Sequence, residues 1–574
     1  MSVAENSKFI SLVPDNGTEF IALVPDNGTE FIAEQKAIFT INPDIGFIKG
    51  RDSYISYDIL NTDSNSRINV LHNTAGANAV IDRMDIFSLQ NGQLMESLTN
   101  YNLWASIQNQ YCEEDDTHTQ LKQNTGVKCR SYDVSQNSTS KVNTLSEIGT
   151  AQNPRVPTDV GATSLSVISS GSQTFSGTYA DATDHDPEMG VKKFTSRKMC
   201  IPIRSGIFSA FGVSEKLTPV LLFGGLKIEI TFAKNEHVLV RPYTPNDANG
   251  AVKQASDFAT GIDVDAQAGG SAIITLTNDI NDPSELGITR GSVMNLRGGA
   301  GAGAAGQKFT VSHLHRGDGG SGDPNKKIVI VATGNLTAVN TNNKIWFEES
   351  TPSYKIKNME LKVLQVIPPR AMMKTLIKES QFDFISWDCF LDNLPQTSRS
   401  HQSDIHSVAS GAKCIMTHYI SVATENDIYA PNYYAGQPPH NTFLNSVQYF
   451  INNKLYPLKA YNPQAKQDKV VNLNEVVKAF QTIGLDVKRL GDGRGGNLCD
   501  YTNTYLHARE LARGEQFVYN LKDAEPQIRL GFTQGRDEVP AGTDAVAKGN
   551  CRIVNFVWSI KTIMVKKDNL QLLL

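Results

Sequence analysis

The sequence predicts an all-β protein built from two β-sandwiches in tandem, and three observations support this. Short runs rich in Ile, Val, Tyr and Phe recur along the chain, separated by Asn, Asp, Ser and Gly, as in many short strands joined by turns. The chain has 574 residues, too many for one ordinary core. The second half continues the strand pattern without repeating the sequence of the first, so each half is expected to form its own sandwich.

The composition of the chain argues against several classes of function. Hydrophobic residues make up 40% and charged residues 20% of the chain, which are values of globular proteins. No apolar run is long enough to span a bilayer, and the first residues lack the basic start and apolar core of a secretory signal. A net charge of -5 argues against coating nucleic acid, because neutralising phosphates requires clustered Lys and Arg. We therefore expect no sequence-specific nucleic-acid binding.

The cysteines predict neither a zinc site nor a disulfide framework. They are odd in number, scattered and without CxxC spacing. The seven are Cys112, Cys129, Cys200, Cys389, Cys414, Cys499 and Cys551.

The N-terminus carries an exact tandem repeat, LVPDNGTEFI at 12–21 and again at 23–32, each closed by an Ala. Each 11-residue unit is a short apolar stretch, a Pro-Asp-Asn-Gly turn and a second short stretch. Two units are too few for a solenoid. We interpret residues 1–36 as an N-terminal arm that docks on a neighbouring subunit; the alternative is a recent duplication in a tolerant terminus.

From residue 37 the pattern predicts strands, then a turn at Asn91-Gly92 and a helix through Tyr101 and Trp104. The predicted strands are 37–43, 52–60, 66–72 and 81–89. Residues 113–190 are polar, and this composition predicts one long surface loop that leaves the sandwich. Its acidic residues lack the spacing of an EF-hand calcium loop and are read as solvated. They are Asp181, Asp184, Asp186 and Glu188.

The stretch 201–232 has the clearest pattern in the chain. A strand leads to a turn or short helix around Phe208 and Phe211, then to an apolar run that stops at Gly224-Gly225. In the closing run LKIEITF, apolar and polar residues alternate, which predicts a half-buried strand over 226–232.

Residues 257–350 predict a small inserted β module with a Gly/Ala loop at 298–306. Arg316-Gly317-Asp318 lies in a glycine-rich turn, where an adhesion loop is one reading and a plain turn the other. His313 and His315 share a strand face but have no third metal ligand nearby in sequence. A long strand over 353–370 is ended by two prolines.

The second half predicts six strands and one helix, at 472–490. The strands are 381–391, 412–424, 443–458, 515–523, 527–534 and 551–567. The last alternates imperfectly, as a strand buried on both faces does.

No catalytic constellation is found. Gly491-Asp492-Gly493-Arg494-Gly495-Gly496 matches GxGxxG by letter but follows a predicted helix, whereas a dinucleotide fold requires a preceding strand. His401 and His406 lie in a polar stretch and are read as solvated. We expect no enzyme activity, no cofactor, no metal and no catalytic or cofactor-binding residue.

The stretch 201–232 resembles the middle of the first roll in double-jelly-roll major capsid proteins, closest to those of virophages and polinton-like viruses. Tyr354 to Asn358, an aromatic-x-x-x-Asn pattern, and Tyr456-Pro457 resemble further features of that family. The resemblance covers roughly 37–570 at the level of pattern and leaves the insertion 257–350 unaligned. It implies two tandem eight-stranded jelly rolls with short helices and long loop insertions.

The resemblance also implies a function. The expected protein is a major capsid protein that forms pseudo-hexameric homotrimers in the icosahedral shell of a double-stranded DNA virus. Its partners would be itself, neighbouring capsomers, and penton and minor capsid proteins; its place would be the virion, assembled in the host cytoplasm or viral factory. The alternatives are a β-sandwich carbohydrate-binding or adhesion protein and, from a third class, a β-sandwich glycoside hydrolase, which needs paired carboxylates.

The expected division is an arm at 1–36, a first jelly roll at 37–367 that includes both insertions, and a second jelly roll with its tail at 368–574. The arm and the tail Asn569 to Leu574 are expected at the inner base of the shell, where they tie neighbouring trimers together. Deleting 1–33 is therefore expected to leave trimers intact but to impair shells.

Overall fold

The structure is a computed structural model, and it describes most of the two predicted sandwiches and the strands of the inserted module. The described residues are 18–62, 70–71, 75–112, 146–147, 196–212, 215–240, 262–267, 271–276, 293–297, 307–316, 328–333, 344–347, 353–367, 381–395, 398–422, 425, 434, 444–462, 466–487, 506–512, 517–522, 524–532, 550–566 and 569–573.

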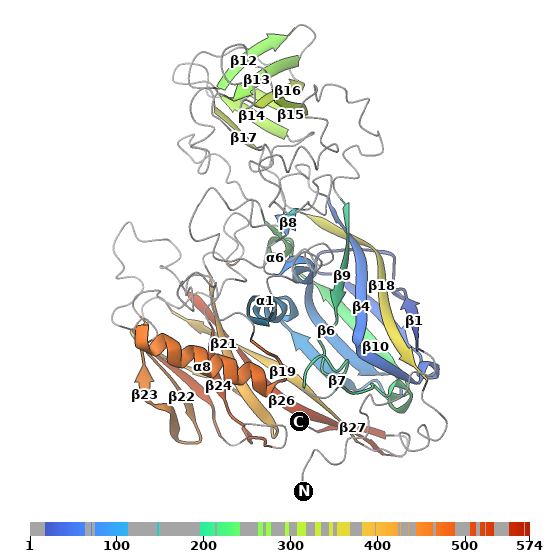
Figure 1. Ribbon diagram of the computed structural model, residues 1–574, viewed down its shortest axis with the longest axis vertical. Helices are drawn as coiled ribbons and strands as arrows, with labels where there is room; N and C mark the ends of the chain where they lie inside the picture. The colour runs from blue at the N-terminus through green and yellow to red at the C-terminus, as the bar shows by residue number, and fades with distance from the viewer. Residues whose placement is uncertain are drawn as a thin grey trace.

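The first sandwich consists of two antiparallel sheets (Figure 1). One sheet has the spatial order β1 (Thr18–Leu23), β18 (Tyr354–Val366), β4 (Phe47–Asn61) and β9 (Ser196–Pro202), and β2 (Glu30–Ile32) also pairs with β18. The other sheet has the order β3 (Lys36–Ile41), β10 (Leu226–Phe232), β6 (Ile81–Ser88) and β7 (Leu94–Thr99).

The second sandwich is built in the same way. One sheet has the order β19 (Gln381–Leu394), β26 (Cys551–Lys566), β21 (Ala412–Ser421) and β24 (His507–Glu510), and β27 (Asn569–Leu573) also pairs with β26. The other sheet has the order β20 (Ser400–Asp404), β25 (Gln527–Phe532), β22 (Leu444–Ile451) and β23 (Lys454–Tyr461).

Both sandwiches share one strand order. When the eight strands of each are lettered B to I in chain order, with β1 and β2 together as strand B of the first, each sandwich places B, I, D and G in one sheet and C, H, E and F in the other. Two sheets connected in this Greek-key order form a jelly roll. The expected double jelly roll is therefore confirmed.

Within the described residues, each roll has one long helix in the same place, between strands F and G. In the first roll it is α1 (Tyr101–Cys112), as expected; in the second it is α8 (Lys466–Thr482). The predicted range 472–490 was too late for α8, because the chain turns at Gly484, where φ is +78°.

The stretch 201–232 folds largely as predicted. The apolar run forms a short 3₁₀ helix, η8 (Val220–Phe223), and Gly224 and Gly225 follow with φ of +64° and +100°. A side chain at Gly225 would stand 2.9 Å from the Ile41 carbonyl oxygen, so the chain can reverse here only with glycine. β10 then buries every second residue.

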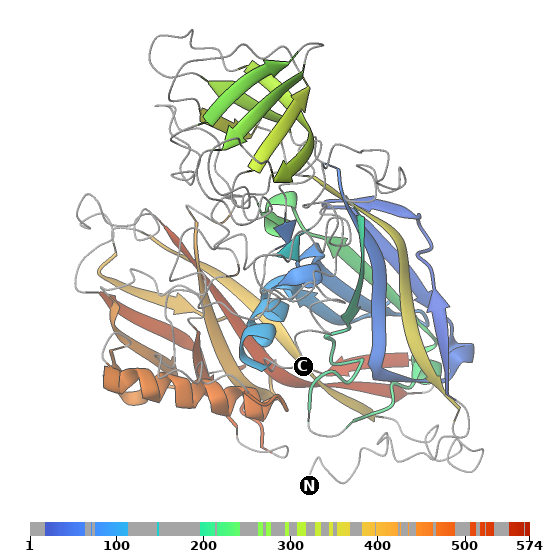
Figure 2. The ribbon, with the colours of Figure 1, turned by 45° about the horizontal axis from the view of Figure 1, so that its top comes forward.

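The remaining elements lie in connections. The short ones are η2 (Pro43–Ile45), η3 (Gly76–Val80), α6 (Asn235–Val238) and a small sheet of β11 (Leu239–Val240), β5 (Val70–Leu71) and β8 (Ser146–Glu147). The inserted module is a sheet of β12 (Ile262–Gln267), β13 (Ser271–Leu276), β16 (Ile328–Thr333), β15 (Gln307–Arg316), β14 (Val293–Arg297) and β17 (Lys344–Phe347). Figures 1 and 2 both place this module beyond the end of the rolls opposite β27.

The N-terminal repeat corrects one prediction. β1 and β2 come from the first and second copies, and both pair with β18 of the same chain, Phe20 opposite Leu364 and Phe31 opposite Ile356. The second turn also holds the edge of β3, where the Asn27 side chain accepts from the Ile38 N–H at 2.9 Å. Residues 18–32 are thus strand B of the first roll, and the expectation of a separate arm up to residue 36 is wrong for them.

The predicted strands of the second half need five corrections. Residues 443–458 are a hairpin, β22 and β23, which turns at Asn452 and Asn453 with φ of +49° and +60°. In the range 515–523, the described residues 517–522 form no strand and make an isolated bridge, Ala412 to Tyr519. The polar strands β20 and β24 and the tail strand β27 were not predicted as strands, and in the first half β7 and β12 were also missed.

Two cores result. One fills the second roll between its sheets, and the other fills the first roll and continues between the two rolls. The side chains of β26 belong to both cores. Ile553 and Val557 face the core of the second roll, whereas Phe556 and Trp558 face the first roll. The prediction that this strand is buried on both faces is confirmed. Among the described residues, no helix is long and apolar enough to cross a membrane.

Candidate assembly surfaces

An aromatic cluster joins the two rolls. Trp104 on α1 lies against Trp558, with ring centroids 4.5 Å apart, and also contacts Trp387 at 5.8 Å. Phe211, from the connection between strands G and H of the first roll, meets Trp558 edge-on at 4.8 Å. Phe480 on α8 stacks on Trp104 at 5.8 Å. Aromatic rings in such contacts stabilise beyond the area they bury, so this is a tight, apolar interface within one chain.

Hydrogen bonds fix the relative position of the rolls. The Trp387 indole N–H donates to the Thr99 carbonyl at 3.1 Å, and Lys216 Nζ donates to the Asp383 carbonyl at 2.8 Å. The Gly212 N–H donates to the Ile483 carbonyl at 2.9 Å. A side chain at Gly206 would collide with the Ile385 carbonyl. The backbones of the two rolls are therefore in direct contact at this point.

Buried Arg204 ties the start of the G–H connection to α1. Its guanidinium donates to the amide oxygens of Gln108 at 3.0 Å, Asn78 at 2.7 Å and Asn109 at 2.5 Å. Its backbone N–H donates to the Tyr101 hydroxyl at 2.9 Å. Arg204 is 4% exposed, and among the described residues it forms no ion pair. A guanidinium supplies several donors in fixed directions, so one side chain satisfies several buried acceptors.

Glu96 on β7 holds the next residues of the same connection. Its carboxylate accepts from the Ser205 hydroxyl and from the backbone N–H groups of Gly206 at 2.9 Å and Ile207 at 3.2 Å. Burial raises the pKa of Glu96 above its ordinary value, against these bonds, which lower it. Both buried charged groups serve to position the G–H connection against the second roll.

Buried His507 on β24 is a structural histidine. Its Nδ1 lies 2.7 Å from the Tyr419 hydroxyl, and burial lowers the pKa of His507 to about 3. The imidazole is therefore neutral at physiological pH.

Large apolar side chains remain exposed on two outer flanks. On the second roll they come from β23, α8 and residues 517–518; on the first roll they come from β1, β2 and the residues beside them. Figure 1 shows β23 and β1 on opposite sides of the molecule.

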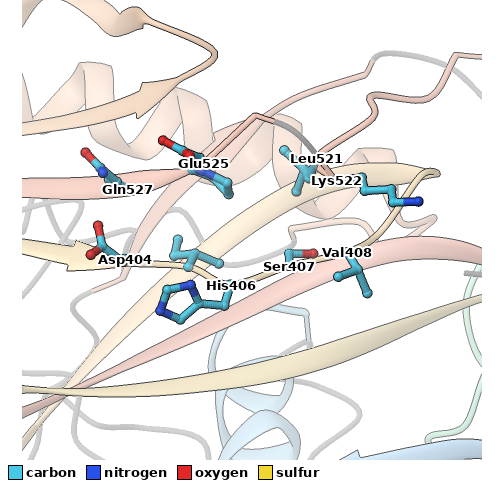
Figure 3. Close-up of a pocket in the computed structure, with 10 residues that line it drawn as sticks. Asp404, His406, Ser407, Val408, Leu521, Lys522, Glu525 and Gln527 are labelled. Atoms are coloured by element: carbon cyan, nitrogen blue, oxygen red, sulfur yellow. The ribbon is translucent and has the colours of Figure 1, made fainter.

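A pocket of about 450 Å³ lies beside the second roll, between residues 404–408 and residues 521, 522 and 525–527. Figure 3 shows Asp404, His406 and Val408 on one wall and Lys522 and Glu525 on the other. The Lys522 and Glu525 side chains point in different directions, so the pocket does not gather its charges around one point.

The structure places few of the considered site residues together. His401 lies in β20, with Nε2 2.9 Å from Asp392 Oδ2, so its reading as a solvated loop histidine is wrong; His406 lines the pocket. The cysteines at 112, 200, 389, 414 and 551 form no disulfide with one another. Within the described ranges, no group of three or more His, Cys, Asp or Glu side chains could hold a metal.

Other predictions lie outside the described residues. These are the acidic set at 181–188, most of the predicted loop 113–190, the Gly/Ala loop 298–306, the glycine motif 491–496, Gly317 and Asp318 after β15, and the side chains of His313 and His315. The aromatic cluster was missed because its members are spread from Trp104 to Trp558; the only signal was the double burial of the last strand.

Comparison with known proteins gives likenesses in structure alone. No protein-family model matches the sequence. No curated protein matches it either. Among solved structures, the Faustovirus major capsid protein is similar at 10% identity and a TM-score of 0.48, over 99% of this chain and 93% of that one. The capsid of PBCV-1 virus is similar at 9% identity and a TM-score of 0.47, over 98% and 97%.

The mavirus major capsid protein is similar at 9% identity and a TM-score of 0.32, over 98% of this chain and 91% of that one. The chain is thus similar along nearly its whole length to viral capsid proteins, while its sequence differs from theirs at about nine positions in ten.

Proposed function

We propose that this chain is a major capsid protein, three copies of which form a pseudo-hexameric capsomer in the icosahedral shell of a double-stranded DNA virus. The proposal rests on one observation: both rolls have the same order of eight strands, and the two rolls pack side by side. Three such chains present six similar units around a threefold axis. A nearly six-sided unit can tile a closed shell, so the role is structural and needs no catalysis.

The proposal divides the chain into a first roll up to 367 and a second roll at 368–574, with 257–350 as an insertion in the first. Its partners are other copies, neighbouring capsomers, and penton and minor capsid proteins. Its place is the virion, with assembly in the host cytoplasm or viral factory. The module and β27 lie at opposite ends of the rolls (Figure 2), which supports an outer and an inner end for the subunit.

The test is the mass and negative-stain outline of the purified full chain. We expect a stable trimer with a pseudo-hexagonal outline. A monomer at high concentration would overturn the proposal. Binding to glycans or cells by that monomer would then favour the adhesion alternative.

Removing the N-terminal repeat is expected to damage the first roll, in contrast to the expectation from the sequence. A deletion of 1–33 takes away β1, β2 and Phe31, whose buried ring lies 5.5 Å from Phe232. Loss of one such ring costs about 3–5 kcal/mol, so we expect little folded protein in gel filtration and a lowered thermal midpoint. Native-like folding of this variant would contradict the pairing of both strands with β18.

A deletion of 1–17 serves as the matched control, because it leaves both strands in place. We expect this variant to form normal trimers but fewer closed shells in electron micrographs. The reason is that, of the predicted arm, only residues 1–17 can still tie neighbouring trimers together. Unchanged shell yield would rule out that role. The tail is a similar case. Because β27 already pairs with β26 of its own chain, the tail's proposed role of tying trimers together is limited to contacts outside this pairing.

A further inference from the structure

We infer that copies of this chain join head to tail through two named surfaces, each of which repeats one side of the contact between its own rolls. The donor flank is β23, α8 and residues 517–518 of the second roll. The acceptor face is the outer side of β1, β2 and β18 in the first roll. This inference rests on the proposed trimer and specifies which surfaces of a second copy meet.

The contact within the chain supplies the template. There, the first roll contributes strand F (β7), its F–G helix (α1) and its G–H connection, which carries Phe211 and Phe223. The second roll contributes the outer side of strands B and I, β19 and β26, with Trp387 and Trp558. Because both rolls have the same strand order, the matching elements of the second roll are the donor flank, and those of the first roll are the acceptor face.

Exposed apolar side chains concentrate on these two surfaces. Of the fifteen large hydrophobic side chains that are exposed among the described residues, nine lie on or beside them. On the donor flank they are Leu458, Val470, Val471, Phe517 and Val518, and on the acceptor side they are Phe20, Val24, Ile32 and Ile367. Leu458 is 90% exposed, on an edge strand. Such grouped apolar surface on a folded protein marks an interaction site.

The N-terminal repeat explains why the acceptor face is apolar. The two copies pair with β18 on either side of an irregularity at Asn358, where φ is +49° and the register with β4 shifts. The buried positions of β18 change phase there, from Ile356 to Met359, as at a β-bulge. The two copies therefore turn opposite sides outward. Phe31 faces the core at 3% exposure, whereas its counterpart Phe20 faces outward at 52%, against Tyr54 at 5.8 Å. In the second copy it is Ile32 that faces outward.

Several charged side chains of the acceptor face are paired with one another. Glu30 carboxylate oxygens lie 2.9 Å from Lys355 Nζ and 2.6 Å from Lys357 Nζ, and hydrogen bonds from both lysines lower the pKa of Glu30. Apolar groups beside polar groups are usual where folded subunits associate. The contact within the chain, in contrast, is aromatic and buried.

A second copy is required as the occupant. Because β23 and β1 lie on opposite sides of the molecule (Figure 1), one chain cannot bring its own donor flank onto its own acceptor face. A contact between two different surfaces is heterologous and closes into a ring when its rotation allows. With two rolls in each chain, a closed ring of six similar rolls contains three copies.

The test compares charged substitutions on the donor flank with a control of equal exposure. Leu458→Glu and Val470→Glu place a carboxylate in the contact, whereas Val408→Glu alters a side chain that is as exposed as Val470, 58% for each, but lies outside both surfaces. Sedimentation gives the mass of each full-length variant over a range of concentrations, and circular dichroism checks folding. We expect each donor variant to raise the dissociation constant of the contact at least about tenfold, while Val408→Glu stays trimeric.

The acceptor face gives the reciprocal test. Phe20→Lys is expected to dissociate trimers in the same way, and Phe31→Leu, the same repeat position facing the core, is expected to leave the mass of the folded protein unchanged. Trimers that persist in all donor and acceptor variants would overturn the head-to-tail assignment while leaving the capsid proposal intact. Equal dissociation by Val408→Glu would also overturn it. A wild-type chain that never trimerises would instead refute the proposed function.

Discussion

Replacing Trp558 with alanine is expected to lower the free energy of unfolding by about 3–5 kcal/mol, the usual cost of truncating a buried tryptophan. Trp558 is fully buried, and its ring lies 4.5 Å from Trp104, 4.8 Å from Phe211 and 5.0 Å from Trp387. The cavity would open between the two rolls. Their unfolding should therefore separate into two transitions in urea, followed by circular dichroism and by fluorescence of the remaining tryptophans.

Trp558→Phe is the matched variant. It keeps an aromatic ring in the cluster and removes an indole N–H that has no hydrogen-bond partner among the described residues. Because a buried donor without a partner is itself unfavourable, this variant should lose less than half as much stability as the alanine variant. Equal losses, or a single unshifted transition in Trp558→Ala, would show that the cluster does not couple the rolls.

Replacing Arg204 with alanine is expected to be about as damaging, at roughly 3–5 kcal/mol, because it removes a buried cation and leaves its acceptors without donors. The side chains of Asn78 and Asn109 are almost fully buried, so water cannot easily replace the guanidinium. Loss of the hydrogen bonds from Arg204 should loosen the G–H connection, which carries Phe211 into the contact between the rolls. Urea denaturation and proteolysis at 203–212 measure the two effects.

Arg51 provides the control for Arg204. Its guanidinium also reaches this connection, donating to the carbonyl oxygens of Ser209 at 3.3 Å and Gly212 at 3.1 Å, but it is exposed. Solvent can replace those bonds, so Arg51→Ala should cost less than about 1 kcal/mol. A loss for Arg204→Ala no larger than that of Arg51→Ala would refute the positioning role of Arg204.

Elements with a strong local pattern were predictable. β10 was predicted to the residue because its polar and apolar side chains alternate cleanly and two glycines precede it. β7, β20 and β24 were missed because they are short and partly polar. In such strands the pairing with neighbours supplies the stability, and that pairing is invisible in one local sequence window.

The surfaces were less predictable than the strands. The sequence showed the tandem repeat, but it was read as an arm, because two short apolar stretches around a turn fit an arm as well as a split strand. Only pairing with β18, more than 300 residues later in the chain, distinguishes the two. The donor flank likewise combines residues from Leu458 to Val518 whose proximity depends on the complete second roll.

By itself, the sequence determined that this protein is all-β, has two halves of similar pattern and carries an inserted β module, because alternation, turn residues and length are local properties. Only the tertiary structure decided the strand order, the placement of the repeat inside the first roll and the aromatic contact between the rolls. Those features depend on contacts between residues hundreds of positions apart. Local periodicity can show which face of a strand is buried, but not which partner buries it.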